Sequence, residues 1–255
     1  MPTPKFRLFA GPNASGKTHV FKKIRKSNLI PKEIYVNADK IEAELGKKRK
    51  FYFNSYRVRT EEGEFKSHIL HSGLFLEKIN DENFPNQFTI RSGVLTIRSD
   101  VKINSYHASF IATYLAEKLF ESRQSFAFET VMSHSSKLDF LRIARKEGYK
   151  TYLYFIFTDD LNTNLARVQL RIADGGHAVS PEHTLARAPR TFKLLSRAFA
   201  LADSAFVIDN SDEARLVLKK ENSILYRAAQ FPAILRKELA SIVKRFSGTV
   251  RKISD

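Results

Sequence analysis

The segment Phe6-Arg-Leu-Phe-Ala-Gly11-Pro-Asn-Ala-Ser-Gly16-Lys17-Thr18 decides the fold of this chain. A short apolar run leads into the pattern G-x-x-x-x-G-K-[ST], which forms a phosphate-binding loop when a strand precedes it and a helix follows. The glycines allow backbone N–H groups to turn toward phosphate oxygens, and the helix adds its positive N-terminal end. Lys17 can then reach the β- and γ-phosphates of ATP, and Thr18 can ligate Mg²⁺. The predicted nucleotide-binding residues here are Gly11, Asn13, Ala14, Ser15, Gly16, Lys17 and Thr18.

Strands and helices alternate along most of the chain, which is typical of a parallel sheet covered by helices. The third and fourth predicted strands are almost continuous apolar runs, as expected for central strands buried on both faces. We therefore predict an α/β fold, a P-loop kinase-like parallel five-stranded sheet flanked by helices. The predicted strands are residues 5–10, 33–37, 125–131, 150–157 and 204–209. The first predicted helix starts at Gly16. The other predicted helices cover residues 38–48, 105–121, 135–147, 161–173 and 181–201.

Two segments break this alternation. Residues 51–103 are rich in aromatic and β-branched side chains and contain a predicted hairpin at 88–97, so we expect a mixed α/β insertion. The core of the predicted kinase domain is then 1–50 with 104–214. The tail, 215–255, is predicted to form a short hairpin and a basic amphipathic helix. We expect this helix to pack on the core, and a partner surface is the alternative.

Composition narrows the class of protein. With 255 residues, 43% of them hydrophobic, the chain can fill a large core. The absence of Cys excludes disulfides, thiolate metal sites and cysteine nucleophiles. The sequence has neither an apolar signal segment nor an apolar run long enough to span a bilayer. We therefore expect a cytoplasmic protein without a membrane partner.

The net charge of +16 lies at the two ends of the chain. Residues 1–50 carry 13 Lys and Arg against 4 Asp and Glu, and residues 215–255 carry 10 against 3. Such a field attracts polyanions, which include nucleotides, nucleic acids and an acidic protein partner. A well-solvated basic surface without a specific partner accounts for the same charges.

Acidic residues follow two of the predicted strands, where ligands of such sheets bind. Asp39, in Asn37-Ala-Asp39, could take the proton of a substrate hydroxyl, or could stabilise the N-terminus of the next helix. Glu129 and Thr130 emerge from the apolar run at 125–131. The carboxylate could hold Mg²⁺ or bind the acceptor, because a carboxylate at the end of a buried strand needs a partner.

A further cluster contains arginines and glycines. Arg167 and Arg171 lie four residues apart and therefore share one face of a helix. Gly175-Gly176 then gives a hinge before a second helix. A hinged lid that carries arginines expels water and neutralises charge on a transferring phosphoryl group. A helix C-terminus with ordinary surface arginines explains the same pattern.

These motifs together resemble the zeta-toxin family of P-loop kinases, in its chromosomal zeta-like branch. The matching pieces are residues 10–18, Asn37-Ala-Asp39, the segments 125–134 and 167–179, Arg187 with 189–191, and Asp209-Asn210-Ser211. They extend over nearly the whole chain outside 51–103 and the tail. The family name does not establish toxicity.

The resemblance implies an ATP- and Mg²⁺-dependent kinase that acts on a sugar hydroxyl, with UDP-N-acetylglucosamine as the best-known substrate of the family. It implies that Asp39 is the general base, that Arg171 and Arg187 are lid arginines, and that Asn210 lies near the adenine. The remaining implied roles are metal binding by Thr18 and Glu129, and substrate binding by Glu129, Thr130, Arg167, His177 and Arg190. Arg187 and Arg190 remain alternatives for the second lid arginine. The resemblance also implies that the insertion at 51–103 shapes the acceptor site.

We therefore expect a kinase of a nucleotide-sugar or a related small anionic acceptor. The first alternative is a kinase of polynucleotide or RNA ends, which the basic termini and the aromatic insertion favour. The second is a non-catalytic, ATP-gated binding module with an acidic, antitoxin-like protein partner.

Overall fold

The computed structural model describes residues 2–27, 30, 33–173 and 181–253. The chain divides into two compact units. Unit 1 contains Met1–Tyr35 and Ser125–Asp255, and unit 2 contains Val36–Gln124. This division differs from the predicted insertion at 51–103, because unit 2 also includes the helices on either side of that segment.

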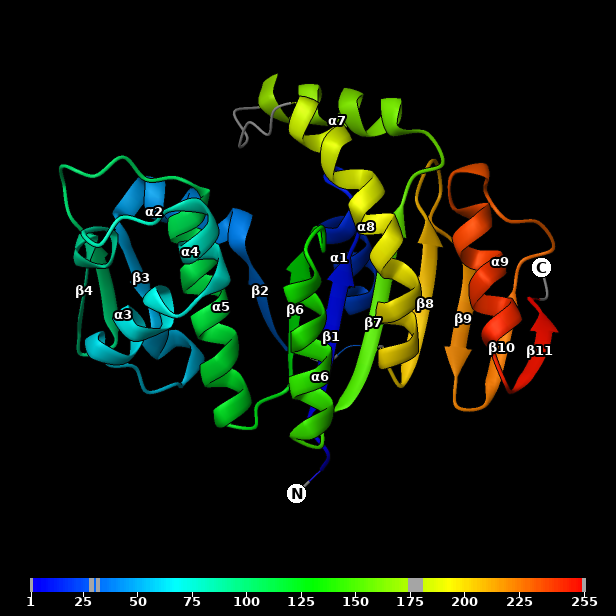
Figure 1. Cartoon of the computed structure of the whole chain (residues 1–255), viewed down its shortest axis with the longest axis horizontal. Helices are drawn as coiled ribbons and strands as arrows, with labels where there is room; N and C mark the ends of the chain where they lie inside the picture. The colour runs from blue at the N-terminus through cyan, green and yellow to red at the C-terminus, as the bar shows by residue number, and fades with distance from the viewer. Residues whose placement is uncertain (1, 28–29, 31–32, 174–180, 254–255) are drawn as a thin grey trace. The chain divides into compact units, whose positions relative to one another are not determined.

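Unit 1 is built on the large sheet of Figure 1. Its strand order is β11-β10-β9-β8-β7-β1-β6-β2, and β2 (Ile34–Asn37) is the strand at which the chain leaves unit 1. The central strands β6, β1, β7 and β8 are parallel, whereas β9 is antiparallel to both β8 and β10. The bounds are β1 Lys5–Ala10, β6 Phe126–Thr130, β7 Lys150–Phe157, β8 Ser204–Asp209, β9 Arg215–Glu221, β10 Ile224–Arg227 and β11 Thr249–Lys252.

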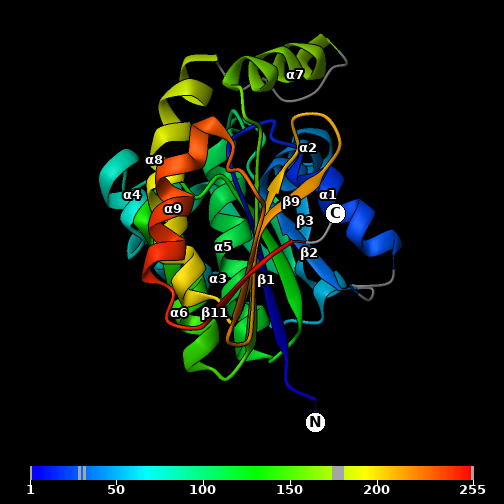
Figure 2. The ribbon, with the colours of Figure 1, turned by 90° about the vertical axis from the view of Figure 1, so that its right-hand side faces the viewer.

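Helices lie on both faces of this sheet. Figure 2 shows α1 on one side of the strands and α8 and α9 on the other. The helices of unit 1 are α1 Lys17–Lys26, α6 Asp139–Lys146, α7 Leu161–Ala173, α8 Pro181–Leu201 and α9 Arg236–Arg245, with short 3₁₀ turns at Ser135–Leu138 and Ala233–Leu235. On α9, Leu239 and Ile242 are buried, so its apolar face is covered.

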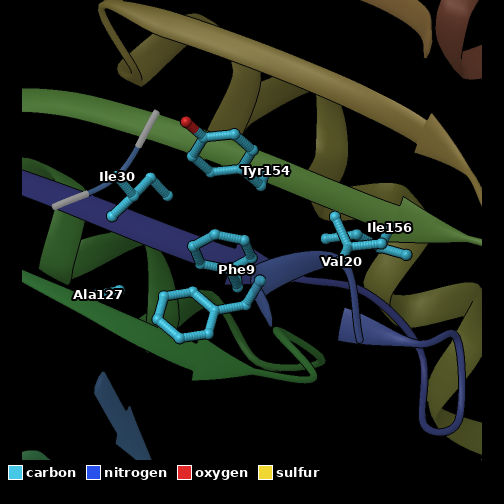
Figure 3. Packing of buried hydrophobic residues seen from close by; sticks show 7 residues of the cluster. Phe9, Val20, Ile30, Ala127, Tyr154 and Ile156 are labelled. Atoms are coloured by element: carbon cyan, nitrogen blue, oxygen red, sulfur yellow. The ribbon is translucent and has the colours of Figure 1, made fainter. Parts of the chain in front are cut away.

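The core beneath α1 supports the predicted phosphate loop. Phe9 of β1 stacks on Tyr154 of β7 with their ring centroids 4.6 Å apart, and Val20 and Phe21 of α1 join the same buried cluster (Figure 3). Burial of an aromatic or branched apolar side chain contributes about 1.5–3 kcal/mol. This packing holds the start of α1 against the ends of β1 and β7.

The predicted α/β fold class is confirmed, and all five predicted strands are present as β1, β2, β6, β7 and β8. The sheet is larger than predicted because the tail adds to it. The tail hairpin, β9 and β10, extends the edge beyond β8, and β11 pairs parallel with β10. The prediction omitted β11, whose four residues are all exposed and therefore lack an alternating apolar pattern.

Unit 2 consists of helices and a three-stranded antiparallel sheet in the order β3-β5-β4. Its aromatic core includes Phe53, Phe65 and Tyr114, whose rings contact one another. The bounds are α2 Ala38–Lys48, β3 Lys50–Tyr52, α3 Glu62–Leu70, α4 Gly73–Lys78, β4 Phe88–Arg91, β5 Val94–Ile97 and α5 Ser105–Glu121, with 3₁₀ turns at Phe53–Tyr56 and Phe84–Gln87. Within the described ranges, none of the helices of either unit has the length and apolar character needed to cross a bilayer.

Candidate active site

The loop between β1 and α1 has the backbone geometry of a phosphate cradle. Gly11 adopts φ +145° and Gly16 adopts φ +87°, which L side chains rarely accept. A Cβ on Gly11 would lie 1.9 Å from the carbonyl oxygen of Ile156, on the neighbouring strand β7. Glycine at position 11 therefore allows the loop to pass against the end of β7, and α1 begins directly after Gly16.

Lys17 is 6% exposed, and its Nζ donates to the carbonyl oxygens of Gly11 and Pro12 at 3.0 and 2.8 Å. The ammonium group is therefore held over the loop. Two polar atoms of the loop, Ser15 Oγ and Asn13 Nδ2, are buried without a hydrogen-bond partner among the described residues. Buried polar groups normally have partners, so these two atoms fit a loop that receives a polar ligand.

Thr18 and Glu129 meet beside the loop. Thr18 is in the first turn of α1, and its Oγ1 donates to Glu129 Oε2 at 2.8 Å. Glu129 is the fourth residue of β6, adjacent to Phe9 of β1 in the parallel register. The Tyr35 hydroxyl donates to the same Oε2 and lies 3.5 Å from Thr18 Oγ1. A hydroxyl and a carboxylate are hard oxygen ligands of the kind that Mg²⁺ binds, and both residues were predicted for that role.

Two asparagine side chains, one from α7 and one from the segment directly after β8, hydrogen-bond to the backbone of the phosphate loop. Asn210, directly after β8, donates from Nδ2 to the carbonyl oxygen of Ser15 at 2.8 Å. Asn164 of α7 donates from Nδ2 to the carbonyl oxygen of Asn13 at 2.6 Å. Both asparagines are buried. The loop conformation is therefore fixed by two side-chain amides as well as by its glycines.

Arg167 connects α7 to the segment after β8. Its Nη1 and Nη2 donate to the carbonyl oxygens of Asn210 and Ser211, each at 2.9 Å. Asp209, 1% exposed, accepts from the backbone N–H of Ser211 at 3.0 Å and from Nη2 of Arg215 at 2.7 Å. The motif Asp209-Asn210-Ser211 is thus an ordered turn that contacts the loop. Substrate binding by Arg167 stays a prediction.

The structure describes some of the residues that were predicted to form the lid. Arg187 is half-buried on α8, and the exposed Arg190 donates from Nε to the carbonyl oxygen of Ala186 in its own helix at 3.2 Å. Arg171 lies in α7, but its side chain falls outside the described part of the chain. His177 lies wholly outside the described residues. The lid roles of Arg171 and of Arg187 or Arg190, and substrate binding by His177 and Arg190, stay predictions.

Two further predicted residues have defined local surroundings. Thr130 ends β6, and its Oγ1 accepts from the backbone N–H of Met132 at 3.1 Å. Asp39 is half-buried in the first turn of α2, in unit 2, after the N-cap Asn37, whose side chain accepts from the N–H of Lys40 at 3.2 Å. A carboxylate at this position stabilises the helix dipole, as the structural alternative predicted. That role is compatible with service as a base, which stays a prediction.

Sequence reasoning missed Tyr35 and Asn164. Tyr35 was assigned only to a strand, although it lies two residues before Asn37 and therefore on the same face of β2. Asn164 precedes Arg167 by three residues, and this spacing places both on one side of α7. An Asn inside a predicted helix was the one signal, because Asn side chains tend to hydrogen-bond to backbone groups outside the helix ladder.

The glycine-bearing loop, the Lys17 contact and the Thr18–Glu129 pair at the carboxyl ends of β1 and β6 define a P-loop kinase-like α/β protein. Comparison with known families is consistent with this class: residues 98–222 match the model of the zeta toxin family. The family resemblance predicted from the motifs is thereby confirmed. The match includes Glu129 and Asn210 but neither the phosphate loop nor Asp39.

Comparison with solved structures gave two examples of interest. The crystal structure of AvrRxo1-ORF1:-ORF2 with ATP has a chain 14% identical to this one, with a TM-score of 0.52 over 86% of this chain and 58% of that chain. A chain of the PezAT chromosomal toxin–antitoxin system of Streptococcus pneumoniae is 16% identical, with a TM-score of 0.49 over 96% and 86%. At 14% identity, the first structure shows likeness of fold alone. The present chain covers 58% of the length of the AvrRxo1-ORF1:-ORF2 chain that it matches. A comparison with curated proteins found no match.

Proposed function

We propose that this chain is a Mg²⁺- and ATP-dependent phosphotransferase that phosphorylates a hydroxyl of a nucleotide-sugar, such as UDP-N-acetylglucosamine, or of a related small anionic acceptor. The observation that carries the proposal is the Thr18–Glu129 pair beside a loop that buries the ammonium group of Lys17. The family match over 98–222 supports the kinase class.

The roles follow from the chemistry of these groups. Lys17 exchanges the carbonyl oxygens of Gly11 and Pro12 for phosphate oxygens, and the N-terminus of α1 adds its dipole to their binding. Thr18 and Glu129 would hold Mg²⁺. When bound, Mg²⁺ neutralises charge that develops on the phosphate oxygens during transfer. Asp39 accepts the proton of the attacking hydroxyl, and Arg171 with Arg187 or Arg190 offsets charge on the transferring group.

The test is transfer of labelled γ-phosphate from ATP to a panel of UDP-sugars, nucleosides and RNA ends. We expect a UDP-sugar or a similar small anion to be labelled. Asp39→Asn should lower turnover by about 100- to 10,000-fold, the usual contribution of a general base, while ATP still binds. Lys17→Ala should weaken ATP binding itself, because the phosphates lose a buried positive charge.

Other outcomes would select the alternatives. Labelling of RNA ends alone would favour a polynucleotide kinase. ATP binding without transfer to any acceptor would favour a binding module, for which unit 1, with its positive charge, suggests an acidic protein partner. Undiminished turnover of Asp39→Asn on the labelled acceptor would remove the assignment of the base.

A further inference from the structure

The Tyr35 hydroxyl donates to the carboxylate that is proposed to hold Mg²⁺. Tyr35 OH and Thr18 Oγ1 both donate to Glu129 Oε2, the latter at 2.8 Å, and the two hydroxyl oxygens are 3.5 Å apart. We propose that Tyr35 is a positioning residue that orients the Glu129 carboxylate for Mg²⁺ binding. This inference rests on the proposed function, since it concerns the metal of the same site.

The Tyr35 ring is held in place by packing against α1 and β1. It stacks on Phe21 with the ring centroids 3.9 Å apart and an interplanar angle of 10°, and its edge meets Phe9 at 6.5 Å and 86°. Phe9 and Phe21 are 0% and 2% exposed, so neither ring can easily move. The hydroxyl therefore has a nearly fixed position.

The same packing links Tyr35 to the other metal-binding residue. Thr18 and Phe21 are three residues apart on α1 and so share one face of the helix. The ring that supports Tyr35 and the hydroxyl of Thr18 thus move together. A shift of α1 would displace both donors to Glu129 at once.

Orientation of this carboxylate matters because Mg²⁺ demands nearly ideal octahedral geometry. A carboxylate on a flexible Glu side chain can rotate, and each donor that it accepts reduces that freedom. Some residues do not bind the metal but hydrogen-bond to its protein ligands. Mutation of such a residue commonly lowers metal affinity by about 10- to 100-fold. Tyr35 acts through Glu129 and is not proposed to contact the reacting atoms.

The hydroxyl can be removed without loss of the ring stack. Tyr35→Phe keeps the contacts with Phe21 and Phe9 and deletes only the donor. Tyr152→Phe is the matched control, because Tyr152 packs on the same side of the sheet beside Arg7, whose guanidinium lies 4.9 Å from its ring centroid. Mn²⁺ is the probe, with binding followed by electron paramagnetic resonance in the presence of a non-hydrolysable ATP analogue.

We expect Tyr35→Phe to bind Mn²⁺ about 10-fold more weakly than the wild-type protein, within the range for such supporting hydrogen bonds. Its affinity for the analogue without metal should be unchanged, and Tyr152→Phe should match the wild type in both. Wild-type affinity for Mn²⁺ in Tyr35→Phe would overturn the positioning role. Equal weakening of metal-free nucleotide binding would also overturn it, because a general loosening of the site would then explain the loss. A wild-type protein that binds the analogue but no Mn²⁺ would refute the metal site itself, and with it both proposals.

Discussion

At the residue scale, Gly16 is constrained twice. Its φ of +87° lies in the left-handed region, and an added Cβ would lie 2.0 Å from Nδ2 of Asn210 and 3.3 Å from its Cγ. Asn210 is 6% exposed and donates to the carbonyl oxygen of Ser15, so its side chain has little room to withdraw. Backbone conformation and packing therefore both require glycine here.

Gly16→Ala should lower the free energy of unfolding by about 1–3 kcal/mol, since a strained backbone conformation alone costs that much. ATP binding should weaken as well, because the displaced Asn210 no longer braces the loop at Ser15. Denaturant unfolding and calorimetric titration with an ATP analogue measure the two effects.

Gly46→Ala is the matched control for this substitution. Gly46 lies inside α2, and apart from its chain neighbours and the backbone of its own helix, no heavy atom of the described residues would lie within 4 Å of an added Cβ. Alanine there should stabilise the helix by about 0.5–1 kcal/mol and leave ATP binding unchanged. If Gly16→Ala behaved in the same way, the account of the loop would be wrong.

The site residues that sequence could predict are those with a fixed spacing. Lys17 and Thr18 follow from the loop pattern, and Glu129 follows from its place after a buried apolar run. Tyr35 and Asn164 could not be found in this way, because each reaches the site from a distant segment. Their contacts depend on strand order and on helix placement, which local patterns do not specify.

At the element scale, the N-terminus of α5 depends on a neutral histidine. The Asn104 backbone N–H donates to His107 Nδ1 at 3.2 Å, and the Asn104 side chain caps the first turn. His107 Nε2 lies 2.9 Å from Gln87 Oε1 and can donate to it. Nδ1 also lies 2.8 Å from Asn104 Oδ1, but as the acceptor of the Asn104 N–H it carries no proton, so the capping contact uses the neutral ring with its proton on Nε2. Burial lowers the pKa of His107 most strongly, the hydrogen bond with the Asn104 backbone raises it and the nearby Arg49 charge lowers it, so that the net shift is downward.

The sign of the pH effect follows from this direction. A lowered pKa in the folded state means that His107 binds a proton more readily when unfolded, so its stabilising contribution is complete above its ordinary value of 6.5. That contribution is lost as the pH falls below 6.5 toward the folded-state pKa. We expect the free energy of unfolding to decrease by about 1 kcal/mol through this residue between about pH 7 and about pH 5.

His107→Gln isolates the contribution. Glutamine at this position can still accept from the Asn104 N–H, as in the usual capping box, but does not titrate. The difference between the unfolding free energies of wild type and variant, measured by urea denaturation at several pH values, should therefore change across this window. Parallel pH profiles would contradict the role of His107.

Elements with strong patterns were predictable and weakly patterned ones were not. The buried central strands β6 and β7 and the hairpin β4–β5 have clear apolar runs or a turn signal. The strand β11 has four exposed residues and exists because β10 offers it an edge. Pairing of this kind depends on tertiary context, so the size of the sheet could not be predicted from local sequence.

At the scale of the whole molecule, the positive charge is concentrated in unit 1. This unit has 29 Lys and Arg against 15 Asp and Glu, a net charge of +14, whereas unit 2 has 14 against 12. On α1, the side chains of Lys22, Lys23, Arg25 and Lys26 are exposed, and no acidic residue accompanies them in that helix. They begin five residues after Lys17, which corresponds to about 8–14 Å along the helix. The Debye length is about 10 Å at 0.1 M salt, so these charges act on a ligand of the loop at low ionic strength.

Replacement of all four α1 cations by Gln should slow association of an anionic ATP analogue by about 10-fold at low salt, because electrostatic steering contributes at least that much in strongly charged proteins. Dissociation should change little, since none of the four is proposed to contact the nucleotide. Stopped-flow measurement with a fluorescent analogue at low and high salt separates the two rates, and the variant should converge on the wild type as salt rises.

A matched variant removes four exposed cations from unit 2, namely Arg59, Lys78, Arg91 and Lys102, and should leave association nearly unchanged. If both variants slowed association equally, total charge would matter and its concentration in unit 1 would not.

The same salt series distinguishes acceptors. A polynucleotide releases many counterions on binding and would lose affinity steeply as salt rises, whereas a small nucleotide-sugar would lose affinity only modestly.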